Sequence, residues 1–207
     1  MQIDIGKNIE DMSMQIIEKE IGKHQYTGSE WAIVKRVIHT TADFDFAKKN
    51  KIIFHQTAIQ NGINALKIGC ELVVDVNGVI GGLHKKNLID FKVNVICNIS
   101  NTMVRDKAKK YNKTISQMSM RESIMHMNDG IIAIGNAPTA LIEVVKMCNE
   151  KVIKPKLIVG IPVGFISATE SKEMLRKSKV PFITNAGRKG GSACAAAIIN
   201  ALFRLMM

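Results

Sequence analysis

The chain has 207 residues, of which 46% are hydrophobic and 23% charged, and this balance is typical of a globular domain with a sizeable core. The N-terminal segment carries acidic residues and lacks the apolar stretch of a secretory signal. The longest apolar run, which starts at Leu157, has about half the ~20 residues of a membrane span. We therefore expect a soluble, cytoplasmic protein with no membrane partner and one domain over residues 1–207.

The net charge of +11 indicates a negatively charged partner. Proteins that read nucleic acids rely on arginine for bidentate contacts and on aromatic rings for stacking. Here only six of the 29 basic residues are arginine, and aromatic residues make up 5% of the chain. An acidic small molecule is therefore better supported than nucleic acid, while a solvated lysine-rich surface with no ligand stays open.

Helical patterns come first along the chain, and short β-branched runs then alternate with further helical segments. The first helices are expected at 8–21, 28–41 and 56–68. Strands are expected at 71–76, 92–96, 131–135, 156–161 and 181–184. Continuous apolar strands in this rhythm predict a doubly wound α/β fold, in which helices cover both faces of a parallel sheet.

The turns that follow these strands are candidate ligand sites, because open parallel sheets bind ligands at the carboxyl ends of their strands. Asn136 is the predicted N-cap of one helix, with Pro138 in its first turn. Ser167–Glu170 fits a capping box, and Asn101 is a third possible cap.

The last turn, in "NAGRKGGSACAAA", contains three glycines that would let a ligand approach the backbone closely. Exposed N–H groups at the start of the following helix would favour an anion. We take Arg188, Gly190 and Gly191 as candidate substrate contacts. The alternative is that the glycines only form the turn and the alanine run packs on the sheet.

The familiar cofactor and metal motifs are missing. "GRKGGS" is neither a P-loop nor a dinucleotide fingerprint, and G-x-S-x-G and H-E-x-x-H do not occur. The cysteines are far apart and include no C-x-x-C pair: Cys70, Cys97, Cys148 and Cys194. We therefore expect no metal site and interpret these residues as buried thiols in a reducing compartment.

A histidine ends the second predicted helix. "TGSE" at 27–30 fits a capping box, and an apolar stripe at helical spacing follows it: Trp31, Val34 and Ile38. His39 shares a helix face with Lys35 and Arg36. The helix C-terminus favours a protonated imidazole and a neighbouring cation opposes it, and this setting suits His39 to donate a proton. Alternatively, His39 only caps the helix, and Asp43 and Asp45 have no assigned role.

Five tracts resemble the precorrin-8X methylmutase family of cobalamin biosynthesis, in the family's order and spacing. They are "RVIHTTADFDF", "ALKIGCELVVDVNGV", "AIGNAPTAL", "LIVGIPVGFISATESKE" and "NAGRKGGSACAAAIINAL". The resemblance implies a flavodoxin-like sheet preceded by helices, a homodimer, and migration of the ring C methyl group of a tetrapyrrole from C-11 to C-12. The product would be hydrogenobyrinic acid or its cobalt form, and no cofactor is implied.

The same resemblance implies roles for individual residues. The family's R-x-x-H motif makes His39 the proton donor and Arg36 a substrate contact, and Ser13 of the first helix is a further contact. The family usually carries an arginine within Thr-Arg-Ser, where this chain has Ile115 in "KTISQ". We predict that Lys113 partly substitutes for it, because Arg121 would lie on a different helix face.

Two other functions stay open from the sequence. One is a non-catalytic corrinoid-binding or carrier protein of the same fold, against which the intact R-x-x-H motif argues. The other is a nucleotide-binding module of flavodoxin type, against which the missing phosphate motifs argue.

Overall fold

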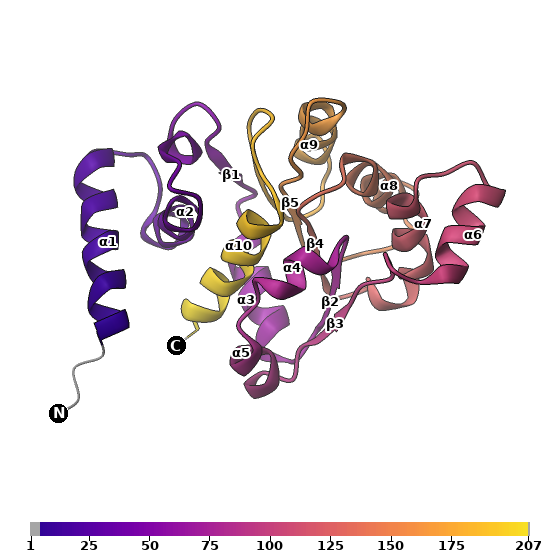
Figure 1. Ribbon diagram of the computed structural model, residues 1–207, viewed down its shortest axis with the longest axis horizontal. Coiled ribbons are helices and arrows are strands. Elements are labelled where there is room, and N and C mark those ends of the chain that lie inside the picture. The colour runs from indigo at the N-terminus through magenta and orange to yellow at the C-terminus, as the bar shows by residue number, and fades with distance from the viewer. Residues whose placement is uncertain (1–4, 207) are drawn as a thin grey trace.

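The computed structural model describes residues 5–206, apart from the side chain of Lys7. Its centre is a six-stranded sheet in the order β1-β6-β5-β4-β2-β3 (Figure 1). The strands are β1 Ile52–Phe54, β2 Glu71–Val74, β3 Asn94–Ile96, β4 Ile131–Ile134, β5 Leu157–Gly160 and β6 Phe182–Asn185. All five expected strands are confirmed, and β1 is an addition.

The five strands from β2 to β6 run parallel to one another. Their order, β3-β2-β4-β5-β6, is the flavodoxin-like order, with the reversal between β2 and β4. The prediction of a flavodoxin-like α/β fold is therefore confirmed. The sheet is not parallel throughout, however, because β1 runs antiparallel to β6, with Ile52 opposite Asn185.

The three N-terminal helices are confirmed. They are α1 Ile5–Ile21, α2 Gly28–Thr41 and α3 Ala58–Lys67. The later helices are α4 Asn77–Gly81, α5 Lys85–Asp90, α6 Thr102–Lys110, α7 Ile115–Glu122, α8 Pro138–Asn149, α9 Ala168–Arg176 and α10 Ser192–Arg204. Two short 3-10 helices are η1 Phe44–Ala47 and η2 Ile124–His126.

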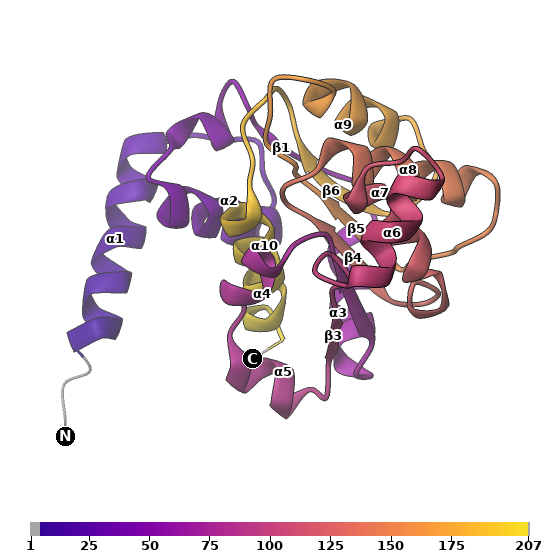
Figure 2. The same ribbon diagram turned by 45° about the vertical axis from the view of Figure 1, so that its right-hand side comes forward.

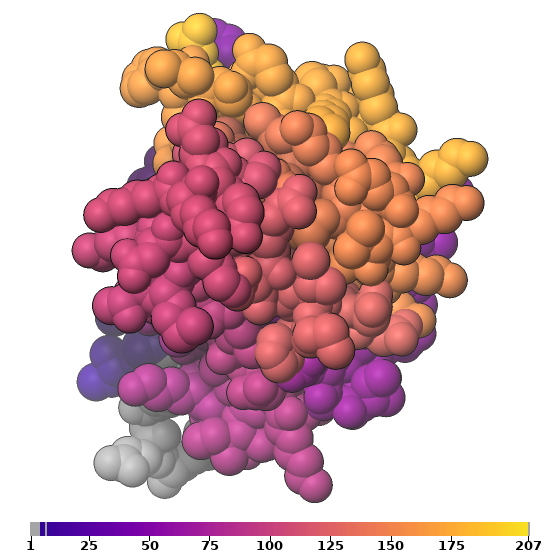
Figure 3. Space-filling view, turned by 90° about the vertical axis from the view of Figure 1, so that its right-hand side faces the viewer, coloured from indigo at the N-terminus to yellow at the C-terminus, as the bar shows by residue number. Residues whose placement is uncertain are grey.

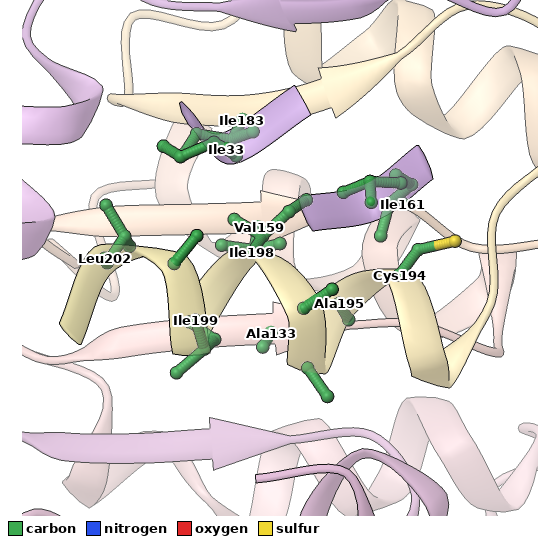
Figure 4. Close-up of a cluster of buried hydrophobic side chains, with 14 of the residues drawn as sticks. Ile33, Ala133, Val159, Ile161, Ile183, Cys194, Ala195, Ile198, Ile199 and Leu202 are labelled. Atoms are coloured by element: carbon green, nitrogen blue, oxygen red, sulfur yellow. The ribbon is translucent and has the colours of Figure 1, made fainter. Parts of the chain in front are cut away.

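One face of the sheet is covered by α10, which carries the alanine run. Small side chains such as Ala195 let this helix approach β4 and β5 closely, while Ile198 and Leu202 fill the space between them (Figure 4). The next layer outward is α2, which packs on α10, and α1 packs on the outer side of α2 (Figure 2). The first helix therefore stands at the margin of the molecule.

The other face has its own hydrophobic core, formed by α8 and α9 on the sheet with α7 outside them. Leu141, Val144 and Leu175 are fully buried there. The space-filling view of this side shows α6 and α7 covering the neighbouring segments (Figure 3). The apolar strands are thus buried on both faces, as their continuous hydrophobic runs predict.

Two of the four predicted helix caps are confirmed and two are wrong. Thr27 and Glu30 form a capping box on α2, and the Asn101 side chain accepts a hydrogen bond from the N–H of Met103. Asn136 is not a cap, since α8 begins after Ala137. Ser167 adopts a left-handed conformation, with φ of 60°, and its side chain makes no capping hydrogen bond, so the proposed box is absent.

Within residues 5–206, no helix is long and apolar enough to cross a membrane. The four cysteines are free, and two of them, Cys97 and Cys148, are only partly buried. The described residues contain no group of three or more His, Cys, Asp or Glu side chains placed to hold a metal ion.

Candidate active site

His39 lies in the last turn of α2 with its side chain exposed. The expected apolar stripe fixes this orientation, because Trp31, Val34 and Ile38 are buried and turn the opposite side of the helix outward. The helix ends at Thr41, and the next residue, Ala42, has a left-handed backbone and donates its N–H to the carbonyl of Ile38 at 2.7 Å. No side chain among the described residues hydrogen-bonds to His39, so its imidazole is free to meet a ligand.

A groove of about 340 Å³ opens beside His39, between the end of α2 and the side of α1. Its lining residues are Ser13, Ile16, Ile17, Glu20, Ile38, His39, Ala42 and Phe44. The structure therefore brings Ser13 and His39, two predicted site residues, to one groove. The Ser13 hydroxyl donates to the Ile9 carbonyl at 2.8 Å, and its oxygen can still accept a hydrogen bond from a ligand.

Arg36 faces a different hollow, one turn back along α2. Its guanidinium is paired with the carboxylate of Glu10 on α1, which also lies 2.7 Å from Arg204 at the end of α10. Burial acts to raise the pKa of Glu10, but hydrogen bonds from the two arginines outweigh it and hold this pKa below its usual value. Arg36 therefore does not line the groove of His39 in this structure.

The two acids that had no assigned role tie the end of α2 to the glycine-rich turn. The ammonium of Lys189 lies 2.7 Å from Asp43 and 2.9 Å from Asp45. The hydrogen bond that Lys189 donates lowers the pKa of Asp45, and its hydrogen bonds to both carboxylates raise the pKa of Lys189. The segment after His39 and the turn after β6 are thus held as one unit.

Within that turn, which we call the glycine loop (residues 186–191), Gly190 and Arg188 have different surroundings. A Cβ atom at Gly190 would lie 2.2 Å from the carbonyl oxygen of Ile161, so only glycine fits there. Gly191 donates its N–H to the same carbonyl at 3.0 Å. Arg188 is exposed, with its guanidinium 5.7 Å from the ring centroid of Phe165. The glycines let the loop lie against the end of β5 and leave Arg188 outside.

The strand-order reversal between β2 and β4 is occupied by Asp75, which follows β2. Its buried carboxylate accepts hydrogen bonds from the backbone N–H of Gly135 at 3.0 Å and from those of Asn136 and Ala137 at 2.8 Å each. The Asp75 carboxylate thus caps the start of α8, the role that the sequence predicted for the Asn136 side chain. Burial raises the pKa of Asp75, although the three N–H donors and the start of α8 favour its ionised form.

Lys113 lies on the other face of the sheet from α2. Its ammonium is 3.7 Å from the buried carboxylate of Glu143, which Arg121 approaches to 2.5 Å. Ile115 packs against a small apolar cluster below α6 and α7. Thr114 contacts Thr139 in the first turn of α8 at 3.0 Å, so this segment reaches the carboxyl edge of the sheet without joining the groove of His39.

Sequence reasoning missed one residue of this region, Lys172 on α9. Its side chain is buried, and its ammonium donates to the carbonyls of Gly187 at 3.0 Å and Lys189 at 2.6 Å. Burial lowers the pKa of Lys172 to about 8. A signal was available, because the inward positions of α9 follow helical spacing and Lys172 occupies one of them: Ala168, Ser171, Lys172 and Leu175.

Comparison with known proteins gives a consistent result. Residues 8–205 match a family model described as precorrin-8X methylmutase. A cobalt-precorrin-8 methylmutase of Leptospira interrogans is 45% identical, over 98% of this chain and 94% of that protein. One from Priestia megaterium is 44% identical, over 95% and 86%. The crystal structure of a precorrin-8X methyl mutase from Thermus thermophilus superposes with a TM-score of 0.89 at 33% identity, covering 97% of this chain and 96% of that one.

Proposed function

Because the chain belongs to the precorrin-8X methylmutase family, we propose that His39 is the acid of a methyl migration on a tetrapyrrole. The protein is an intramolecular methyl transferase, an isomerase of cobalamin biosynthesis. The observation that carries the proposed role of His39 is its exposed imidazole, which shares one groove with Ser13 and has no hydrogen-bond partner among residues 5–206.

The chemistry asks little of the protein. The methyl group leaves C-11 and bonds to C-12 of the same macrocycle, so no electrons enter or leave and no covalent bond to the protein forms. A proton from His39 added to the macrocycle draws electron density from C-11, the carbon that the methyl group leaves. The proton returns to His39 when the product forms. General acid catalysis of this kind contributes about 10²–10⁴-fold.

Cationic and polar groups around His39 suit a substrate with several acetate and propionate carboxylates. We propose that Ser13 accepts or donates a hydrogen bond at the groove and that Arg188, Gly190 and Gly191 meet a carboxylate at the glycine loop. Arg36 would join them by exchanging Glu10 for a substrate carboxylate. Lys113 would serve a more distant carboxylate at the same edge of the sheet.

The cobalt form is the proposed natural substrate, because relatives at 44–45% identity are named cobalt-precorrin-8 methylmutase. A metal inside the macrocycle needs no ligand from the protein. We further propose that residues 1–207 act as a single domain in the cytoplasm.

A homodimer is the proposed assembly. An apolar stripe on the outer side of α1 supports it, with spacings of four, three and four residues that place its members on one helix face. Its members are Ile5, Ile9, Met12 and Ile16, which are 53–70% exposed. A second copy of the chain would cover this stripe. Since Ile16 also lines the groove of His39, the interface would lie beside the active site.

The test of function is turnover by the purified protein. Metal-free and cobalt-loaded precorrin-8 are offered separately, and the product is followed by absorbance and identified by its fragmentation in mass spectrometry. We expect conversion of the cobalt form without added cofactor. Binding of both forms without conversion of either would instead identify a carrier protein.

A further inference from the structure

Lys172 holds its charge in an unusual place. The side chain is 1% exposed, and its ammonium is satisfied by two backbone carbonyls rather than by a carboxylate. Cys194 on α10 is a titratable group near it, and burial raises the pKa of this thiol to about 11, so the thiol is uncharged at neutral pH. A buried cation without a counter-ion is unfavourable, so stability alone does not explain a lysine at this position.

The two carbonyls belong to the glycine loop, and Asn185 holds the loop from the same side. The Asn185 amide donates to the carbonyls of Ala186 at 2.8 Å and Lys189 at 2.9 Å. The Lys172 and Asn185 side chains thus draw a series of loop carbonyls toward the protein interior. On the outer side, the Lys189 side chain is fixed to Asp43 and Asp45, close to His39 in the chain.

Peptide geometry then sets the direction of the loop N–H groups. In a trans peptide, the N–H of each residue points away from the carbonyl of the residue before it. The carbonyls of Gly187 and Lys189 point inward to Lys172, so the N–H groups of Arg188 and Gly190 point outward. Within residues 5–206, neither N–H finds an acceptor.

We propose that Lys172 is a positioning residue of the active site: by holding the carbonyls of Gly187 and Lys189, it presents the N–H groups of Arg188 and Gly190 to a substrate carboxylate. This inference rests on the proposed function. Lys172 itself does not touch the substrate. Its charge would face the bound carboxylate through the loop, so the ligand would supply the anion that the two carbonyls around the Lys172 ammonium do not.

The experiment compares Lys172→Met with the wild-type protein, using two probes in calorimetric titrations. One probe is hydrogenobyrinic acid, and the other is a derivative in which its side-chain carboxylates have been converted to amides. Methionine keeps the length and the apolar stem of lysine but donates no hydrogen bond. We expect the variant to bind the acid at least about tenfold more weakly, the effect of one hydrogen bond to a charged group, and to bind the amide within twofold of wild type.

Ser171→Ala is the matched control, because Ser171 is a buried neighbour on α9 that donates only to the Ala168 carbonyl, at 2.9 Å. It should leave both affinities unchanged. If Lys172→Met does not fold, Lys172→Gln, which keeps an amide donor, takes its place. Equal loss for both probes, or no loss for either, would overturn the positioning role. Failure of the wild-type protein to convert precorrin-8 would count against the proposed function instead.

Discussion

Arg36 on α2 and Glu10 on α1 form an ion pair that occupies the arginine of the R-x-x-H motif. We expect a substrate carboxylate to compete with Glu10 for this guanidinium. Because Glu10 belongs to α1, its displacement from Arg36 would remove one attachment of α1 to α2.

The first prediction follows from that competition. Arg36→Ala should weaken binding of hydrogenobyrinic acid by about 1.5–3 kcal/mol, as expected for a hydrogen bond to a charged group, and Arg36→Lys should restore it only in part. Glu10→Gln should tighten binding, since it releases the guanidinium. Titration calorimetry measures all three. Unchanged affinity in every variant would mean that Arg36 serves only to attach α1.

His39→Ala should lower kcat by about 10²-fold or more, because it removes the proton donor. The side chain is exposed and unpartnered within the described residues, so the melting temperature and product affinity should stay at wild-type values. His84→Ala removes another exposed imidazole, at the start of α5, and is the control. Turnover near the wild-type rate in His39→Ala would refute the role of proton donor.

The stripe on α1 predicts how the dimer can be broken. Light scattering at micromolar concentration should show twice the mass of one chain for the wild type, and a single chain for the double variant Ile9→Glu, Met12→Glu, since carboxylates would have to be buried at the interface. Ile89→Glu alters an apolar residue on α5 that is even more exposed, and this variant should remain dimeric. A monomeric wild type would disprove the assembly, and a dimeric double variant would place the interface elsewhere.

Lys113 is expected to contribute to binding despite its contact with Glu143. Lys113→Ala should weaken substrate binding by roughly 1 kcal/mol, and added salt should diminish the difference. Ile115→Arg should be tolerated, since Ile115 is only partly buried. It should also tighten binding, because the new guanidinium can pair with a substrate carboxylate. Binding assays at low and high salt test both variants. If Lys113→Ala has no effect at low salt and Ile115→Arg abolishes activity, this segment contacts the substrate through apolar groups and binds no carboxylate.

Gly190→Ala should be severely destabilising, by about 2 kcal/mol or more, because a Cβ atom meets the backbone of Ile161 and the φ of 158° disfavours side chains. Gly28→Ala is the matched control, at a position in α2 where a Cβ atom meets nothing within 4 Å. Urea unfolding followed by fluorescence of Trp31, the single tryptophan, compares the two. Wild-type stability in Gly190→Ala would show that the loop can relax away from β5.

Local patterns predicted the elements that depend on local physics. The long apolar runs became the parallel strands, and the capping boxes or caps at Thr27 and Asn101 were found because donor and acceptor lie within three residues. The strand β1 has only three residues and owes its conformation to pairing with β6, far along the chain. The cap of α8 likewise comes from Asp75, some sixty residues earlier in the sequence. In both cases the pairing residue lies too far along the chain for a local sequence pattern to reveal it.

The sequence predicted the residues of the candidate site only where they belong to a recognisable motif. The R-x-x-H tract indicated His39, whose side chain is exposed in the last turn of α2. The occupation of Arg36 by Glu10 and the link from Lys189 to Asp43 depend on how α1 and the glycine loop fold back on α2. Lys172 could have been noticed as a charge at an inward helix position, although only the structure shows what it holds.

Asp75 has a consequence for where this fold can work. In flavodoxin-like sheets, the crevice at the strand-order reversal is the customary seat of a phosphate-bearing cofactor. Here the Asp75 carboxylate accepts hydrogen bonds from the N–H groups of Gly135, Asn136 and Ala137, so these three donors are already engaged where a phosphate would bind. A side chain of the protein itself thus fills the customary cofactor position, and the proposed proton donor, His39, lies elsewhere, at the end of α2.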